Sequence, residues 1–280
     1  MAVDLHTHST ASDGSVEPGE LVREAAALGL RAIALTDHDT LEGIPEAQRA
    51  AGAESIELIP GVELSLEWER GGMHLVVLWL DPGNGPLQDR LGELQRGRDS
   101  RNATIVDRLR SLGVDITLEE VEVEAGSGSV GRPHIAAVMV RKGYVPDIVT
   151  AFDQYLANGK PAYVGRLRLS PEDGIRLSLE SGGVPILAHP HTLGIDNRFE
   201  MADLLDRLID AGLIGIECYY GTYDRPGRAG LTALARRFGL TPAGGSDFHG
   251  TYKEDVVLGT GRVGLEVPDH VLEELKAQRP

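Results

Sequence analysis

The chain has 280 residues, of which 41% are hydrophobic, so it can bury one large core or one core with a modest inserted lobe. Its formal net charge is -16 and its pI is about 5.0. Because surfaces that coat nucleic acid or face a membrane depend on an excess of lysine and arginine, this charge excludes an extended surface of either kind. Any nucleic-acid substrate must therefore be short and held locally.

The single cysteine, Cys218, cannot form an intramolecular disulfide. No positively charged leader with an apolar stretch precedes Val3, and the longest apolar runs, such as residues 75–80, are far shorter than the roughly 20 residues that cross a bilayer. The sequence therefore predicts a cytoplasmic protein without membrane contact. It indicates no obligate protein partner.

Seven short apolar runs predict buried parallel strands, which are apolar throughout because both of their faces are covered. The runs are residues 2–5, 32–35, 56–62, 75–80, 184–188, 213–216 and 240–243. Helical patterns lie between them, and three of these patterns are each followed by a glycine: residues 17–28, 202–211 and 231–238. About seven alternating strands and helices favour an α/β barrel over an open sheet.

The alternation breaks once, between residues 86 and 169, where the pattern becomes mainly helical and includes the loose segment Gly126-Ser127-Gly128-Ser129. We interpret this stretch as an insertion into the barrel. The prediction is a barrel formed by residues 1–85 and 170–280, with a helical insertion at residues 86–169 that covers the active site.

Unusual polar residues lie where the predicted strands begin or end. One is Glu217, at the end of the sixth apolar run; the others are His6, His8, Asp13, His38, Glu63, His74, His189, Asp247 and His249. In parallel barrels the active site forms at the carboxyl ends of the strands. Residues two apart on a strand point the same way, so His6 and His8 can direct both imidazoles toward one point. Asp247 and His249 repeat this spacing.

These residue types together indicate a metal centre. A carboxylate such as Glu63 can bridge two ions while imidazoles complete each shell, a mixture that suits manganese, iron or zinc. Calcium or magnesium alone would favour oxygen ligands. A single histidine is more often a hydrogen-bonded residue than a ligand, but six of the nine histidines lie at the strand ends. The sequence therefore predicts two or three divalent metal ions (Mn, Fe or Zn).

The ordered set of motifs resembles that of the polymerase and histidinol phosphatase (PHP) family over most of the chain. The motifs are Asp4-Leu5-His6-Thr7-His8-Ser9, Ser12-Asp13-Gly14, Thr36-Asp37-His38-Asp39, Gly61-Val62-Glu63, His74, Ala188-His189-Pro190 and Ser246-Asp247-Phe248-His249. The resemblance implies an α/β fold, a distorted seven-stranded (β/α) barrel of the PHP type with a mainly helical inserted lobe.

The resemblance also implies how the ligands divide among three ions. The first ion would have His6, His8, Glu63 and Asp247, the second Glu63, His74 and His189, and the third Asp13, His38 and His249.

The inserted lobe is similar to that of the small bacterial phosphoesterases of the family. Those members remove the 3'-phosphate from nucleoside 3',5'-bisphosphates, and some degrade short RNA from its 5' end. The resemblance thus implies a metal-dependent phosphoesterase that uses metal-activated hydroxide on a small phosphorylated substrate, a nucleotide or short RNA. Two alternatives stay open: a histidinol-phosphate phosphatase, and a non-catalytic metal-binding module of a larger assembly.

Catalysis also requires a proton for the leaving group. His191, His249 or a metal-bound water could donate it, and the sequence does not choose among them. Asp247 is counted with His191 and His249 as a catalytic residue. His191 follows the Ala-His-Pro motif, where many members carry a different pair of residues, so the proton donor is the least defined part of the site.

Four residues of the insertion are predicted to bind the substrate: Arg132, His134, Lys160 and Arg166. Arg132 and His134 belong to a Gly-Arg-Pro-His segment that begins a predicted helix, where backbone donors and a guanidinium can receive a phosphate. This segment also resembles a substrate-facing element of similar members.

Overall fold

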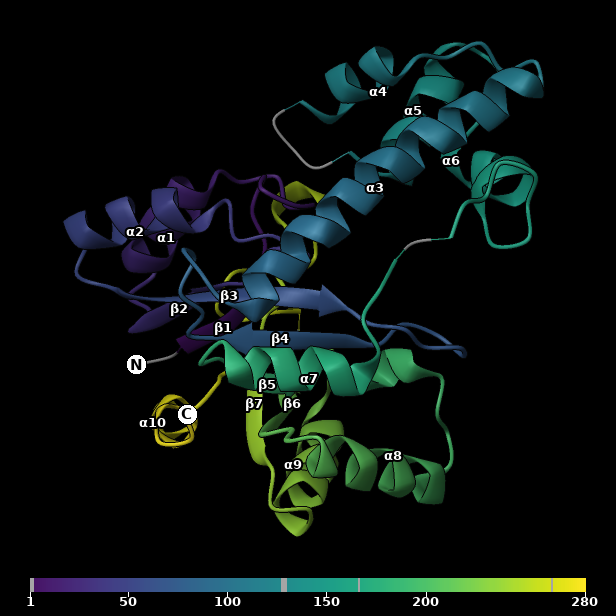
Figure 1. Ribbon diagram of the computed structural model, residues 1–280. Coiled ribbons are helices and arrows are strands. Elements are labelled where there is room, and N and C mark those ends of the chain that lie inside the picture. Colours follow the sequence, from purple (N-terminus) through teal and green to yellow (C-terminus); the bar gives the residue numbers. More distant parts are fainter. Residues whose placement is uncertain (1–2, 127–129, 166, 263) are drawn as a thin grey trace. The chain divides into compact units, whose positions relative to one another are not determined.

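The computed structural model describes residues 3–126, 130–165, 167–262 and 264–280. Within these ranges seven strands form one sheet in which spatial order follows chain order (Figure 1). They are β1 (Val3–Thr7), β2 (Ala32–Leu35), β3 (Glu57–Ser65), β4 (His74–Leu78), β5 (Val184–Leu187), β6 (Gly215–Tyr220) and β7 (Thr241–Gly245). Near the carboxyl ends of β1 and β7, the Asp247 N–H donates to the His6 carbonyl and the His8 N–H donates to the Phe248 carbonyl, both at 2.9 Å. The sheet thus nearly closes, which confirms the predicted seven-stranded α/β barrel.

The prediction that all seven strands are parallel is wrong for β4, which runs antiparallel to both β3 and β5. A short turn between Ser65 and His74 returns the chain beside β3, so no crossover helix separates these two strands. The first residue of β4, His74, pairs with the last residue of β3, Ser65. His74 therefore lies at the same end of the barrel as the carboxyl ends of the parallel strands.

Side chains alternate between the barrel interior and its outer layer. Val3 and Leu5 of β1 and Ala32 and Ala34 of β2 belong to the interior cluster, together with side chains of α10. The intervening Ile33 and Leu35 instead pack under α1 and α2. The small alanines suit a narrow interior, and the apolar filling leaves polar side chains for the strand ends.

Ten α-helices lie in the described ranges (Figure 1). They are α1 (Pro18–Ala27), α2 (Ile44–Ala53), α3 (Pro86–Ser111), α4 (Leu118–Ala125), α5 (Arg132–Arg141), α6 (Ile148–Ala151), α7 (Pro171–Glu180), α8 (Arg198–Asp210), α9 (Arg225–Arg237) and α10 (Asp269–Lys276). Two helices start earlier than predicted because polar caps precede them. Asn197 accepts from the Phe199 N–H before α8, and Asp224 accepts from the Gly227 N–H before α9.

The chain divides into two compact units, Met1–Leu91 with Arg168–Pro280, and Gly92–Leu167. The second unit has its own apolar core, built from α3, α4, α5, α6 and a π-helical turn, Phe152–Leu156. Of the predicted loose segment 126–129, residues 127–129 lie outside the described residues. Across the described ranges, no helix combines the length and the apolar character that crossing a membrane requires.

Candidate metal centre

Four side chains from three strand ends form a compact cage. The Nε2 atoms of His6 and His8 lie 3.1 Å apart, and Glu63 Oε2 lies 3.2 and 3.1 Å from them. Asp247 Oδ1 completes the group at 3.6 and 3.4 Å from the same nitrogens. A tetrahedral ion with bonds near 2.1 Å would separate its ligand atoms by about 3.4 Å. The cage therefore has the size of a first coordination shell.

The second oxygen of Glu63 serves a different pair of imidazoles. Glu63 Oε1 lies 2.8 Å from His74 Nδ1 and 2.8 Å from His189 Nε2. Glu63 is 1% exposed, so its two oxygens face two groups of nitrogen atoms in a buried position. This is the arrangement that a carboxylate bridging two cations requires.

A third group lies toward the solvent. Asp13, whose side chain is 55% exposed, has its oxygens 3.4 Å from His249 Nε2 and 3.7 Å from His38 Nε2. His8 Nδ1 is 3.6 Å from the same carboxylate, and His38 Nδ1 is 3.3 Å from Glu63 Oε2. The nine predicted ligands thus form one continuous cluster, buried at His6 and His8 and open at Asp13.

Hydrogen bonds outside the cluster fix which imidazole nitrogens carry hydrogen. His249 Nδ1 lies 2.9 Å from the Asp247 carbonyl, which can only accept, so Nδ1 carries the hydrogen. The Thr192 hydroxyl donates to the Gly72 carbonyl and therefore accepts from His189 Nδ1–H at 3.2 Å. With the hydrogen on Nδ1, the lone pair of Nε2 is left to face the carboxylates of the cluster, as metal ligation requires.

Several buried polar atoms of the cluster have no hydrogen-bond partner within the described residues: His8 Nδ1, His38 Nδ1 and Glu63 Oε2. Buried polar atoms are almost always paired, because an unpaired one costs free energy. Lone pairs on the imidazole nitrogens and carboxylate oxygens also face one another across the cage. Cations at the centre of these groups would satisfy both features, so the residues present fit a metal centre.

The charges in the cluster are strongly coupled. Burial opposes ionisation throughout, yet the surrounding carboxylates raise the pKa of His6 well above its usual value and that of His8 to about 10. Despite the same burial, neighbouring imidazoles hold the pKa of Glu63 and Asp247 well below normal. Burial lowers the pKa of His38 to about 3. The carboxylates thus require positive charge nearby, and a bound cation would replace protons on His6 and His8.

The backbone is strained at the same place. Among the described residues, four non-glycine residues have positive φ, and three of them belong to the cluster or flank it: Asp39 (53°), His189 (22°) and Asp247 (57°). Such conformations persist only where the surrounding structure imposes them, and they concentrate at functional sites. The local geometry is therefore built around the direction of these side chains.

Comparison with known proteins agrees with this geometry. The family model described as the PHP domain matches residues 4–97. The 3',5'-nucleoside bisphosphate phosphatase of Chromobacterium violaceum is 35% identical, over 88% of this chain and 87% of its own length. The 5'-3' exoribonuclease of Haemophilus influenzae is 36% identical, over 88% of this chain and 89% of its own length.

The chain belongs to the PHP family. A crystal structure from Bifidobacterium adolescentis, of a protein assigned as a metal-dependent phosphoesterase, superposes with a TM-score of 0.81 at 30% identity, over 99% of this chain and 96% of the other. The protein is accordingly a metal-dependent phosphoesterase, a hydrolase of the PHP type.

His191, a candidate proton donor from the sequence, lies in the barrel unit, whereas the described residues predicted for substrate binding lie in the second unit. His191 is exposed at the barrel end, where the Tyr223 hydroxyl lies 2.9 Å from its Nδ1 and partial burial lowers its pKa. In the second unit, Arg132 donates to the Leu156 carbonyl at 3.0 Å, the Gly131 N–H donates to His134 Nδ1, and Lys160 is exposed. Arg166 lies outside the described residues.

The sequence did not predict that three further residues contact the ligands of the cluster. Glu217 contacts His6, while the Tyr220 hydroxyl and Lys253 Nζ each lie 2.6 Å from Asp247 Oδ2. Glu217 had a signal in the sequence, because a carboxylate inside an apolar strand must be paired. The other two depend on how loops fold, which no local pattern reveals.

Other polar residues near the ligands hold the loops in place. Asp37 accepts from the Ser9 N–H and from the hydroxyls of Ser9 and Ser12, and Asp39 accepts from the Ser65 N–H. Asp37 and Asp39 thus hold the backbone segments on either side of the ligands in place. The hydroxyls of Ser9 and Ser12 donate to a carboxylate and have no histidine partner among the described residues, so neither is arranged as an activated nucleophile.

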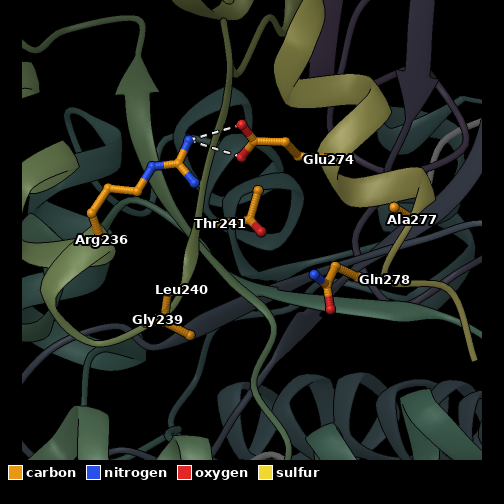
Figure 2. A pocket seen from close by; sticks show the side chains of 7 residues that line it. All are labelled: Arg236, Gly239, Leu240, Thr241, Glu274, Ala277 and Gln278. Carbon is orange, nitrogen blue, oxygen red and sulfur yellow. Dashed lines mark hydrogen bonds and ion pairs between the residues drawn. The ribbon is translucent and has the colours of Figure 1, made fainter.

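A surface pocket of about 420 Å³ lies elsewhere on the barrel, between α9, β7 and α10 (Figure 2). It includes Thr241, the first residue of β7, whereas Asp247 follows the last residue of that strand. An ion pair between Arg236 and Glu274, 2.8 Å long, lies across it. This pocket is therefore at the opposite end of β7 from the metal cluster.

Tyr220→Phe is expected to weaken Mn²⁺ binding about tenfold, because second-sphere hydrogen bonds to metal ligands typically contribute 10–100-fold to affinity. The change removes the hydroxyl that holds Asp247 Oδ2 and keeps the buried ring. Titration of metal-stripped protein with Mn²⁺ measures the effect. Tyr144→Phe, in the second unit, is the matched control, and equal affinities for the two variants would contradict the role of Tyr220.

Proposed function

We propose that this phosphoesterase removes the 3'-phosphate from nucleoside 3',5'-bisphosphates and also acts on short RNA that carries a 5'-phosphate. Two of the relatives described above are named as a 3',5'-nucleoside bisphosphate phosphatase and a 5'-3' exoribonuclease, and both match most of the chain. The net charge of -16 favours a short substrate over a long nucleic acid. The observation that carries the proposal is the Glu63 carboxylate, which faces separate groups of histidines with its two oxygens.

In this proposal the divalent cations are held by the nine clustered residues. His6, His8, Glu63 and Asp247 would hold one ion, Glu63, His74 and His189 a second, and Asp13, His38 and His249 a third. When bound, such ions supply a water of lowered pKa and neutralise the charge of the phosphoryl oxygens. Manganese, iron and zinc all suit this mixture of nitrogen and oxygen donors.

The geometry supports different roles for the two histidines considered for proton donation. Since His249 Nδ1–H is donated to a carbonyl, its Nε2 can either ligate a cation or carry a proton, and its position beside Asp13 favours ligation. His191 is outside the ligand groups, and its ring centre lies 6.1 Å from that of His189. We therefore assign the leaving-group proton to His191, with the Tyr223 hydroxyl holding the ring in place.

Activity with a panel of substrates tests the proposal. The enzyme, loaded with Mn²⁺, is assayed with adenosine 3',5'-bisphosphate, a 5'-phosphorylated oligoribonucleotide, histidinol phosphate and a cyclic phosphodiester. The highest kcat/KM is expected for the bisphosphate, with release of the 3'-phosphate. A preference for histidinol phosphate would support the alternative phosphatase, and activity unaffected by chelation would refute metal dependence.

Arg132→Ala is expected to raise KM for the bisphosphate about tenfold while changing kcat little, because a guanidinium that binds a phosphate away from the reacting bond contributes to binding alone. Steady-state kinetics measure both constants. Arg141→Ala, on the same helix and ion-paired with Glu124, is the matched control. Because Arg132 also lies over the rings of Phe152 and Tyr163, thermal unfolding must accompany the assay. An unchanged KM would remove Arg132 from substrate binding.

A further inference from the structure

Glu217 is a buried carboxylate that none of the three predicted ligand sets uses. It lies within β6 between Ile216 and Cys218, and all three residues are at most 2% exposed. Its neighbours show the usual apolar character of the strand: burial raises the pKa of the Cys218 thiol to about 12. A charged group in such a place is retained only if specific partners compensate its desolvation.

The two oxygens of Glu217 bind two different parts of the metal centre. Oε1 lies 3.0 Å from His6 Nδ1, and Oε2 accepts the backbone N–H of His189 at 2.7 Å. His6 belongs to the ligand set of the first ion, and His189 to that of the second. The two imidazoles are stacked, with ring centres 5.7 Å apart and planes inclined by 25°.

Each contact fixes a feature that ligation requires. A carboxylate accepts hydrogen from His6 Nδ1, which leaves the lone pair on Nε2, the nitrogen that faces His8 and Glu63. At His189 the φ angle of 22° is strained, and the bond from its N–H to Glu217 helps to hold the residue in that conformation. The direction of the His189 ring toward Glu63 depends on this backbone geometry.

We propose that Glu217 is the positioning residue that couples the first two ion sites, because a single buried carboxylate orients one ligand of each. This inference rests on the proposed metal centre and adds a linkage that ligand spacing does not provide. Glu63 connects the two sites through the ions themselves, whereas Glu217 connects their ligands before any ion is bound.

Glu217→Gln separates this role from simple packing. The side chain keeps its size, but only one end of the amide can accept a hydrogen bond. If the oxygen faces His6, the amide NH₂ faces the His189 N–H, donor against donor. If the NH₂ faces His6, Nδ1 must accept and the hydrogen moves to Nε2, where it blocks ligation. Either orientation damages one of the two sites.

The experiment is a titration of chelator-stripped protein with Mn²⁺, in which electron paramagnetic resonance reports free Mn²⁺. Relative to wild type, Glu217→Gln is expected to weaken at least one binding step by about tenfold or more, the lower end of the effect of second-sphere partners. The step that belongs to Asp13, His38 and His249 should keep its affinity. The control is Glu200→Gln, a surface glutamate of α8 ion-paired with Arg70, which should match wild type.

A second variant distinguishes positioning from packing. Glu217→Asp keeps both acceptor oxygens but fills the space less well than glutamine, so it should bind Mn²⁺ more tightly than Glu217→Gln if hydrogen bonding matters. If Glu217→Gln binds Mn²⁺ more tightly than Glu217→Asp, the proposal is overturned. It is also overturned if Glu217→Gln and wild type bind Mn²⁺ equally well. Thermal unfolding with chelator present verifies that each variant is folded. A wild type that binds no Mn²⁺ would instead refute the metal centre itself.

Discussion

Glu63→Gln is expected to lower kcat/KM for phosphate-ester hydrolysis by at least about 10³-fold, which corresponds to about 4 kcal/mol of transition-state stabilisation. Glu63 Oε1 faces His74 and His189 at 2.8 Å, and Oε2 faces His6 and His8 at 3.2 and 3.1 Å. An amide has no negative charge, and its NH₂ end cannot ligate a cation. The substitution therefore removes the bridge between two ion sites while the size of the side chain is preserved.

The measurement is steady-state kinetics with saturating Mn²⁺, together with the number of Mn²⁺ ions bound per chain. Glu57→Gln is the matched control, because Glu57 begins the same strand, β3, and forms an ion pair with Lys276 at 2.8 Å. This control should retain wild-type activity. If Glu63→Gln stays within tenfold of wild type, the carboxylate does not bridge the reacting centre.

The cluster itself was predictable because strand geometry is periodic. His6 lies in β1 and His8 follows the last residue of that strand, so strand periodicity predicted that their rings point the same way. The 3.1 Å distance between their Nε2 atoms agrees with that expectation. The ends of the barrel strands bring residues from distant parts of the chain to one place. His74 was predicted as a ligand from the resemblance to the PHP family, although the start of a parallel strand would lie at the opposite end of the barrel. The antiparallel direction of β4 brings His74 to the end where the other ligands lie.

The contacts that hold the ligand side chains in place could not be predicted from the sequence in the same way. The partners of Asp247 come from β6 and from the turn that contains Lys253, and their positions depend on the twist of the barrel and on loop conformation. Arg132 is a comparable case within the second unit: its contacts with Phe152 and Tyr163 require the complete fold of that unit. Hydrophobic periodicity specifies which face of an element is buried, and it does not specify which polar atoms meet across loops.

Asp247→Asn is expected to lower kcat/KM by about 10²–10³-fold, or about 3–4 kcal/mol, because it removes a charged ligand of the first ion without altering the backbone. Asp247 has a φ of 57°, a left-handed conformation that asparagine tolerates as well as aspartate. Its Oδ2 accepts from Tyr220 and Lys253, both at 2.6 Å, so the amide oxygen must stay on that side. The NH₂ is then directed toward His6 and His8, where it offers no lone pair to a cation.

Mn²⁺-dependent kinetics and a binding isotherm on the same protein separate a loss of Mn²⁺ affinity from a loss in the chemical step. Asp255→Asn is the matched control, since Asp255 is an exposed residue of the same C-terminal region, ion-paired with Arg262 at 2.7 Å. If excess Mn²⁺ restores full activity to Asp247→Asn, the carboxylate contributes only to affinity. If activity stays low at saturating Mn²⁺, its charge also acts in the chemical step. Wild-type binding and activity without excess Mn²⁺ would show that Asp247 is not a ligand.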